Sequence, residues 1–208
     1  MLKHEWRKYE KDLYIPPSKP VEVKVPRLKF FTIEGQGNPN DEAFSEYISA
    51  LYSISYAVKM SYRSDLKPGG YFEYTVYPLE GVWDITDEAK KTYNGKIDKD
   101  SLVFNLMIRQ PDFVNTEFAK KIIQATMKKK PHPLLDKVKF QSIIEGKCLQ
   151  MMHRGSFDDE PKSFALMQDY CDKKGLVRES KLHREIYLSD VRKVSPEKLK
   201  TVLRFKIK

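Results

Sequence analysis

Residues 30–44, FFTIEGQGNPNDEAF, contain the passage that decides the fold: an apolar run, a loop with two glycines and a proline, and the start of a helix. A glycine-rich turn between a strand and a helix can direct backbone N–H groups at a phosphate, which would indicate a nucleotide enzyme. Gly35 and Gly37 lack the third glycine of a dinucleotide-binding loop, and no Gly-Lys-Ser/Thr follows as in a P-loop. We therefore interpret the glycines as parts of a tight strand-to-helix turn, in which Asn38 caps a helix with Pro39 at its first position.

The same kind of passage recurs in the second half of the chain. Residues 151–164, MMHRGSFDDEPKSF, again contain a strand, a glycine, acidic residues and a helix with an early phenylalanine, in this order. Because further strands follow each passage, the chain is predicted to hold two βαββ units. The expected fold class is α+β, with duplicated βαββ halves at residues 27–110 and 138–208, pseudo-twofold symmetry and a ligand groove between the halves.

Hydrophobic periodicity and chain breakers predict the elements around these passages. Residues 1–14 should form a short polar helix with a proline-spaced linker after it, so residues 1–20 are set apart from a domain at 21–208. Residues 85–100 match no pattern and are expected to form a lid or simply a loop. Further elements are predicted at these positions: a strand at 27–34, a helix from Pro39 through Val58, strands at 71–77 and 102–109, a helix at 114–130, a hairpin of strands 136–144 and 147–155 joined at Glu145 and Gly146, a helix that ends before Gly175, and strands at 183–190 and 199–208.

The composition indicates a folded protein of one domain or two small fused halves, long enough at 208 residues to bury a core. Hydrophobic residues make up 40% of the chain, and no apolar run reaches the roughly eighteen residues of a membrane span. The N-terminus shows no export signal, so the expected location is cytoplasmic and no membrane partner is expected. We expect the two cysteines, Cys148 and Cys171, to be reduced and packed.

The net charge of +9 permits an anionic partner. The lysines are spread along the chain, however, and the dense run Lys128–Lys130 falls where a helix ends, a place where cations interact favourably with the helix dipole. Because no basic helix, RNP sequence or zinc finger accompanies the charge, nucleic acid is not an expected partner.

Two further classes of site find no support in the residue spacing. The four histidines (His4, His132, His153 and His183) show no metal-ligand spacing, so no metal and no cofactor are expected. Ser156 follows a glycine without the G-x-S-x-G pattern of a nucleophile elbow, so a hydrolase triad is not expected either.

Alternation selects the candidate catalytic residues. In residues 183–190, HREIYLSD, the apolar Ile186 and Leu188 should face a helix. The alternate residues then lie on the opposite face: His183, Glu185, Tyr187 and Ser189. A carboxylate among aromatic rings is poorly solvated, and this raises its pKa and suits it to proton transfer or to binding a cation. The alternative is an exposed sheet face with ordinary polar residues.

Residues 71–77, YFEYTVY, repeat this arrangement in the first half. If they form a strand, Tyr71, Glu73 and Tyr77 lie on one face, so this strand also presents a carboxylate flanked by tyrosines. His153 ends a strand beside the second glycine loop and could line the groove, although a hydrogen-bonded structural histidine is the alternative.

Four stretches resemble a known family. Residues 183–208, HREIYLSDVRKVSPEKLKTVLRFKIK, are similar to the C-terminal signature of the GyrI-like small-molecule-binding proteins. Residues 25–44, 70–83 and 108–114 (VPRLKFFTIEGQGNPNDEAF, GYFEYTVYPLEGVW and IRQPDFV) resemble a free-standing subgroup, the cyclopropanoid cyclopropyl hydrolases. The resemblance extends over about residues 20–208, and the family's fold agrees with the duplicated βαββ units predicted above.

The resemblance implies that the chain binds a hydrophobic, planar, drug-like molecule in an aromatic groove, as a monomer or homodimer. The subgroup hydrolyses the cyclopropane ring of DNA-alkylating cyclopropanoids of the yatakemycin type, which protects the cell. The family's pocket glutamate maps onto Glu185, which would orient or deprotonate the attacking water, while Tyr187 or a nearby donor would stabilise the developing charge. The ligand-binding residues expected from these motifs and strands are Trp83, Tyr71, Tyr77, Glu73, Phe104 and His153.

Two other functions stay open at this stage. The protein could bind and sequester a drug or metabolite without chemistry, because that function needs the same aromatic rings and glutamate. A protein–protein inhibitor is a third possibility that the family name suggests. For single aromatic residues such as Phe104, packing in the core is the first expectation.

Overall fold

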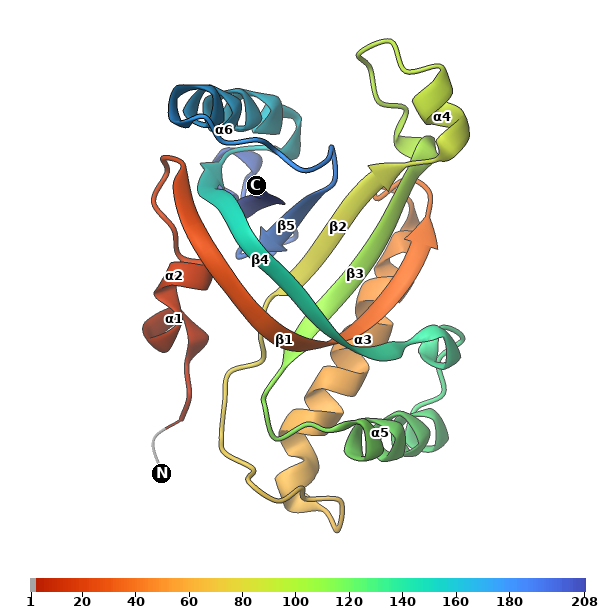
Figure 1. Cartoon of the computed structure of the whole chain (residues 1–208). Coiled ribbons are helices and arrows are strands. Elements are labelled where there is room, and N and C mark those ends of the chain that lie inside the picture. Colours follow the sequence, from red (N-terminus) through yellow and green to blue (C-terminus); the bar gives the residue numbers. More distant parts are fainter. Residues whose placement is uncertain (1–2) are drawn as a thin grey trace. The chain divides into compact units, whose positions relative to one another are not determined.

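A computed structural model of the chain describes residues 3–208, in which strands and helices are mixed (Figure 1). The strands are β1 (Val21–Gln36), β2 (Leu79–Ile85), β3 (Leu102–Gln110), β4 (Lys139–Arg154), β5 (His183–Tyr187) and β6 (Lys200–Lys206). The helices are α1 (Trp6–Tyr9), α2 (Lys11–Tyr14), α3 (Glu42–Met60), α4 (Asp87–Lys91), α5 (Thr116–Lys129) and α6 (Glu160–Lys174). The strands follow one another in the order β1-β3-β2-β5-β6-β4 in a closed barrel. The α+β class expected from the sequence is therefore confirmed.

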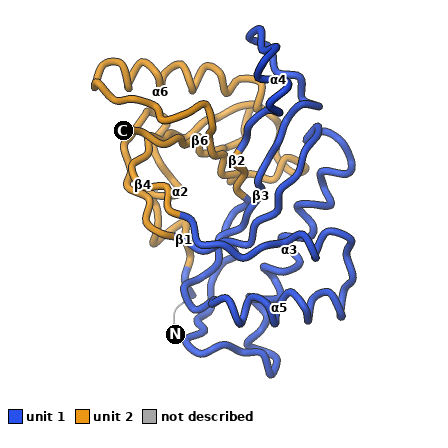
Figure 2. The backbone as a smooth tube through the Cα atoms, turned by 45° about the vertical axis from the view of Figure 1, so that its right-hand side comes forward, with its two compact units in different colours: residues 1–4, 28–79, 83–143 blue, residues 5–27, 80–82, 144–208 orange. Residues whose placement is uncertain are grey.

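The chain divides into two compact units, coloured separately in Figure 2. Unit 1 contains residues 28–79 and 83–143, together with Lys3 and His4. Unit 2 contains residues 5–27, 80–82 and 144–208. The long strands β1 and β4 each contribute residues to both units, so the units are not consecutive pieces of the sequence.

Unit 1 is built on the antiparallel pair β1 and β3, in register from Lys29 opposite Gln110 to Gln36 opposite Val103. Helix α3 packs against β3 and α5 (Figure 1). The buried residues of α3 recur at helical spacing, and this makes one face of the helix apolar. They are Ala50, Leu51, Ile54, Ser55 and Val58.

Unit 2 contains the antiparallel strands β4, β6 and β5, with β6 between the other two. Helix α6 packs its buried Met167 and Cys171 on a core with Leu149 and Leu203 from the strands. The helix ends as predicted at Gly175, whose φ of 66° is the left-handed conformation that glycine adopts without a steric penalty.

The N-terminal segment is part of unit 2. The sequence predicted one polar helix at 1–14, of which residues 1 and 2 lie outside the described residues, but the structure has the two short helices α1 and α2. They bury Trp6 and Tyr14, and the Met152 N–H donates to the Pro17 carbonyl at 2.9 Å. The predicted linker is therefore fixed along the sheet, and β1 begins at Val21 instead of residue 27.

The two glycine passages also differ from prediction in detail. Helix α3 begins at Glu42 instead of Pro39, because the Asn38 side chain accepts from the Asn40 N–H in a local turn and does not cap the helix. Gly35 lies opposite Phe104 in the β1–β3 pair, and a Cβ there would lie 2.4 Å from the Phe104 ring. Gly37, with a φ of 117°, then turns the chain.

Two predicted strand arrangements are wrong. Residues 71–77 form no strand, and Tyr74 makes only an isolated bridge with His4, because aromatic packing, not a strand ladder, buries Tyr74 and Tyr77. Residues 136–155 form no hairpin, because β4 runs unbroken through Gly146, whose φ of 76° the strand accommodates. Alternation at residues 71–77 therefore did not produce a strand, and the glycine at 146 did not end one.

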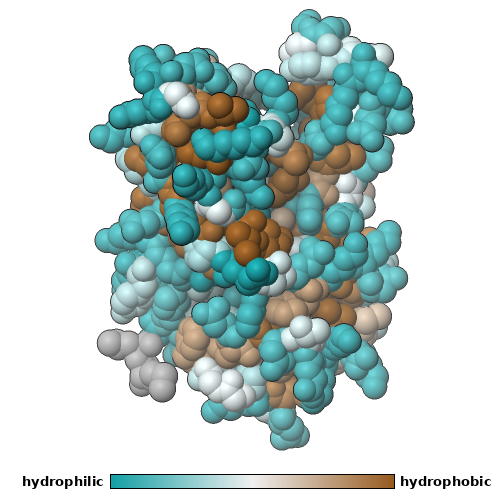
Figure 3. All heavy atoms as spheres, viewed as in Figure 1, coloured by the Kyte–Doolittle hydropathy of each residue, from teal (hydrophilic) through white to brown (hydrophobic). Residues whose placement is uncertain are grey.

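The segment at residues 85–100 contains α4, capped by the Thr86 hydroxyl, which accepts from the Ala89 N–H at 3.2 Å. Its residues after α4 are exposed. Hydrophilic side chains cover most of the face in Figure 3, with apolar side chains scattered between them. Among residues 3–208, no helix combines the length and the apolar character that crossing a membrane requires.

Candidate functional site

Glu185 is a buried carboxylate near the middle of β5, with 8% of its surface exposed. Two neighbours on the same strand face bind its two oxygens. His183 Nε2 lies 3.0 Å from Oε1, and the Tyr187 hydroxyl donates to Oε2 at 2.8 Å. The sequence predicted that these three side chains share a face, and this is confirmed.

Glu160, the first residue of α6, is the fourth member of the group, which we call the Glu185 cluster: Glu160, His183, Glu185 and Tyr187. Glu160 is 7% exposed, and one of its carboxyl oxygens lies within 4.8 Å of a carboxyl oxygen of Glu185. Its Oε1 atom has no hydrogen-bond partner among the described residues. Burial, together with the nearby Glu185 carboxylate, raises the pKa of Glu160 far above its ordinary value.

Aromatic rings from the α6 side cover this cluster. The Phe164 ring of α6 lies 4.8 Å from the His183 ring, and Phe157 in the short helical turn η4 (Phe157–Asp159) lies 5.9 Å from Tyr187. Glu185 therefore faces α6, and the prediction that Ile186 faces the helix is wrong. Both faces of β5 are buried, so an apolar residue on one face did not identify the side that meets the helix.

The opposite face of β5 contains a buried ion network. Arg184 donates from Nη1 to Glu80 at 2.7 Å and from Nε to Glu145 at 2.9 Å. Arg204 also contacts Glu145, at 3.1 Å, and donates to Gln150. Burial by itself would raise the pKa of Glu145, but the two arginines outweigh it and hold this pKa below its ordinary value. Burial raises the pKa of Glu80, an effect that the arginines oppose.

The fold brings together a group that the histidine spacing did not reveal. One ligand-type atom each from Glu160, His183 and Glu185 lie within 4.8 Å of one another, a distance that suits a shared cation. A nitrogen that binds a metal must be unprotonated, whereas His183 Nε2 points at an acceptor-only carboxylate oxygen. With its hydrogen on Nε2 the imidazole donates to Glu185, and without it the same nitrogen is a candidate ligand.

Two predicted ligand-binding residues of unit 1 lie side by side. The Trp83 and Phe104 rings are 5.4 Å apart, and Phe44 and Tyr47 of α3 complete what we call the Trp83 cluster. Trp83 is 7% exposed and Phe104 is 5% exposed. These rings form a packed aromatic group, which agrees with the expectation of core packing for Phe104.

The other predicted residues of unit 1 lie elsewhere. Tyr71 contacts Phe113 at 5.2 Å, and its hydroxyl donates to the Lys59 carbonyl. Tyr77 is buried and has the Arg109 guanidinium 4.5 Å from its ring centre. Glu73 is exposed, because the segment that was expected to bury it is not a strand.

His153 is buried in β4 and both its ring nitrogens have protein partners. Nδ1 lies 2.9 Å from the Ser163 hydroxyl, and Nε2 lies 2.9 Å from the Ser156 carbonyl. This matches the structural alternative considered for this residue. The histidine connects the second glycine loop with α6.

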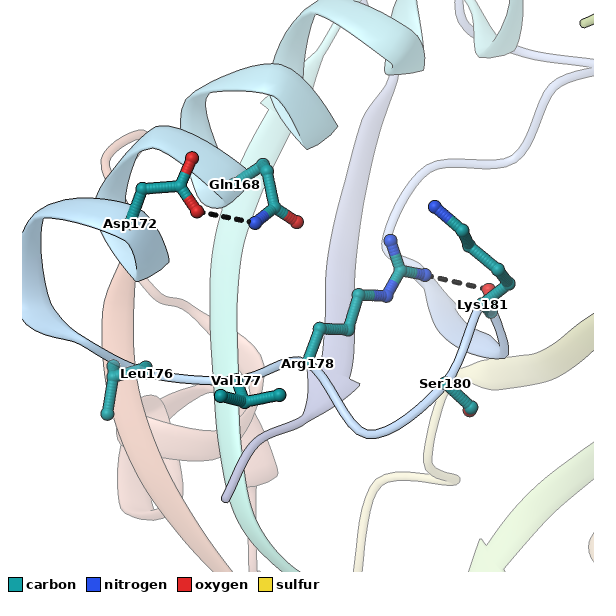
Figure 4. A pocket seen from close by; sticks show the side chains of 7 residues that line it. All are labelled: Gln168, Asp172, Leu176, Val177, Arg178, Ser180 and Lys181. Atoms are coloured by element: carbon teal, nitrogen blue, oxygen red, sulfur yellow. Dashed lines mark hydrogen bonds between the residues drawn. The ribbon is translucent and has the colours of Figure 1, made fainter.

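Two pockets among the described residues are lined by no member of the Glu185 cluster. The larger, about 430 Å³, lies between α6 and the following loop (Figure 4). There Arg178 donates to the Lys181 carbonyl at 2.7 Å. The smaller, about 240 Å³, is lined by residues from Asp65–Gly69 and the start of α5. Neither is lined by a predicted site residue.

Sequence reasoning missed Glu160 as a site residue. The acidic run Asp158–Glu160 before Pro161 was interpreted as the start of a helix, which is correct. Asp159 of this run pairs with Lys162 at 2.6 Å, one turn into the helix. No local pattern marks Glu160 as a site residue, because its position beside Glu185 comes from the packing of α6.

Comparisons with known proteins agree with this architecture. The family model of the GyrI-like small molecule binding domain matches residues 18–208. Two similar solved structures are a hydrolase from Listeria innocua (35% identity, TM-score 0.89, covering 99% of this chain and 100% of that one) and a hydrolase encoded by lin2189 from Listeria innocua (34% identity, TM-score 0.90, covering both chains fully).

A more distant likeness concerns the fold alone. The EcmrR C-terminal domain has 13% identity and a TM-score of 0.53, over 91% of this chain and 97% of that domain. Comparison with the curated proteins gives no match. The family model matches nearly the whole chain, and two solved structures share about a third of its residues. The chain therefore belongs to the GyrI-like small-molecule-binding domain family.

Proposed function

We propose that this protein hydrolyses the cyclopropane ring of planar, DNA-alkylating cyclopropanoids of the yatakemycin type. The observation that carries the proposal is Glu185, a buried carboxylate fixed by His183 and Tyr187 in a chain that resembles two hydrolases. A fixed carboxylate of this kind can orient a water molecule and accept its proton. The aromatic surround supplied by Phe157 and Phe164 suits a flat, apolar substrate.

The proposed reaction needs no covalent intermediate. The water oxygen forms a bond to the ring methylene while one cyclopropane C–C bond breaks. The electron pair of that bond moves through the conjugated system to the carbonyl oxygen, which becomes a phenolate. Glu185 accepts the proton of the attacking water, and that proton returns through solvent to the phenolate. Water is the only co-reactant, so the product is the substrate plus one water.

The hydrogen bonds assign different roles to the neighbours of Glu185. The Tyr187 hydroxyl donates a hydrogen bond to Glu185, so we assign to Tyr187 the positioning of this carboxylate. An ionised carboxylate offers about four lone-pair directions, and His183 and Tyr187 occupy two of them. The remaining directions are available to a water and to Glu160.

Ligand binding by aromatic rings and the internal duplication belong to the same proposal. We assign stacking on flat ligands to Trp83 and Phe104 first, because these two predicted residues lie together. Support for the duplication comes from the two glycine passages. Gly37 and Gly155 have φ angles of 117° and 129°, and each follows a strand and precedes a helix.

The test is incubation with a cyclopropanoid, followed by mass detection of a product that carries one added water. Glu185→Gln keeps the shape but cannot accept a proton, so we expect turnover to fall by about 10²- to 10⁴-fold. Binding, followed by quenching of tryptophan fluorescence, should change little. Glu179→Gln, an exposed change in the same unit, is the matched control. An unchanged rate in Glu185→Gln would remove Glu185 from this role.

Binding without chemistry is the second candidate, and the family's small-molecule-binding description favours it. In that case a cyclopropanoid at micromolar concentration would quench the tryptophan fluorescence of the wild-type protein, and no hydrated product would form. The same two measurements therefore separate the two functions.

A further inference from the structure

We infer that Glu160 is protonated at neutral pH and donates a hydrogen bond to the Glu185 carboxylate, which makes Glu160 a positioning residue for Glu185. Its catalytic consequence rests on the proposed function. Its protonation state does not, and can be measured without a substrate.

The hydrogen bonds around Glu185 assign the proton. Glu185 Oε2 accepts a hydrogen bond from the Tyr187 hydroxyl, and Glu185 Oε1 lies 3.0 Å from His183 Nε2. A hydrogen bond between two carboxyl groups this close needs one proton, and we place it on Glu160 because Glu185 already accepts the Tyr187 hydroxyl. The arrangement also explains why Glu160 Oε1 lacks a partner, since a neutral carbonyl oxygen loses less by burial than a carboxylate oxygen does.

The charges that face Glu160 point the same way. From β5 it meets Glu185, with His183 and Tyr187 beyond, and from η4 it meets Asp158, whose charge also opposes ionisation of Glu160. His153 of β4 has both ring nitrogens engaged, with Ser163 and Ser156. Two buried carboxylates this close cannot both be ionised without a cation between them, so they share one proton.

A divalent metal ion is the other cation that could serve the pair. The two cases differ at His183, because a metal requires Nε2 without a hydrogen, whereas donation to Glu185 Oε1 requires one. Zinc titration of the wild-type protein is therefore included as a test. Stoichiometric binding of zinc that Glu160→Gln abolishes would replace the shared proton with a metal and overturn the inference.

The direct measurement is infrared spectroscopy of the free protein. At pH 7 we expect a carbonyl absorption of a protonated carboxylic acid that shifts in D₂O and is missing in Glu160→Gln. Glu42→Gln is the matched control, because Glu42 is the first residue of α3 and is exposed. A wild-type spectrum identical to that of Glu160→Gln in this region would show that Glu160 is ionised.

The activity measurement has a readout that a purely structural role would not change. In the wild type, kcat should fall at alkaline pH as Glu160 loses its proton. Glu160→Gln keeps an N–H donor that does not titrate, so the fall of kcat at alkaline pH should disappear in this variant. Its kcat should also exceed that of Glu160→Ala by about tenfold, the factor for one hydrogen bond. Equal rates and identical pH profiles in the two variants would overturn the positioning role. If the wild type shows no turnover, the proposed function fails while the infrared result stands.

Discussion

Unit 2 contains two pairs of buried glutamates on opposite faces of β5, and they are compensated differently. Glu80 and Glu145 lie on the face of Arg184, where two guanidinium groups neutralise them. Glu160 and Glu185 lie on the face toward α6, where the partners are a histidine and a tyrosine. Adjacent residues of one strand, Arg184 and Glu185, thus belong to two different electrostatic environments.

The difference teaches what each pair can do. Glu145 accepts hydrogen bonds from two arginines, which hold its pKa below its ordinary value, and it contributes to structure. A pair without a fixed cation keeps a proton and can exchange it, which is what acid–base chemistry requires. Burial is common to both pairs, so burial alone does not identify a site.

Removing the fixed cations should have the largest effect on stability. Arg184→Met leaves the buried Glu80 without its ion-pair partner and Glu145 with Arg204 alone, and we expect a loss of about 3–5 kcal/mol in the free energy of unfolding. Urea titration measures it. Arg192→Met, at an exposed arginine paired with Asp190, should change stability by less than about 0.5 kcal/mol. Similar losses of stability in the two variants would show that Arg184 contributes no more than an exposed arginine does.

The same substitution should have opposite effects in the two pairs. Glu145→Gln removes a charge that two arginines need and should cost about 3 kcal/mol at pH 7. Because the pKa of Glu145 is held below its ordinary value, that contribution is present at neutral pH and is lost as the pH falls into the acid range.

Glu160→Gln should instead stabilise the protein at alkaline pH. The pKa of Glu160 is raised in the folded state, so the folded protein keeps a proton that the unfolded chain releases above about pH 4.3. Wild-type stability is therefore lost as the pH rises, and the advantage of Glu160→Gln should grow from pH 5 to pH 9. Thermal unfolding across this range gives the sign. A variant that is less stable than the wild type at pH 9 would contradict the assignment.

The smallest effect should come from Tyr187→Phe. It removes one donor to Glu185 and keeps the ring that contacts Phe157, so turnover should fall by about tenfold with little change in binding. Tyr9→Phe, at an exposed tyrosine of the same unit, is the control. A larger loss than in Glu185→Gln would make the tyrosine, not the glutamate, the central residue.

Much of the Glu185 cluster could be predicted because strand alternation is local. The period of two in HREIY placed His183, Glu185 and Tyr187 on one face without any knowledge of the remaining fold. The same logic failed for residues 71–77, where the alternation is real but no partner strand pairs with it. Pairing depends on segments distant in sequence, which a local pattern does not identify.

The sequence by itself determined the α+β class, the glycine passages, the helices that follow them and the residues that share a face with Glu185. Each of these follows from backbone preferences and from the period of side chains along one element. Only the tertiary structure decided that Glu185 faces α6, that Glu160 is its neighbour and that the arginines lie on the other side. The physical reason is that both faces of β5 are buried, so the contrast between polar and apolar residues does not show which face meets the helix. Packing between elements that are distant in sequence then selects the partners.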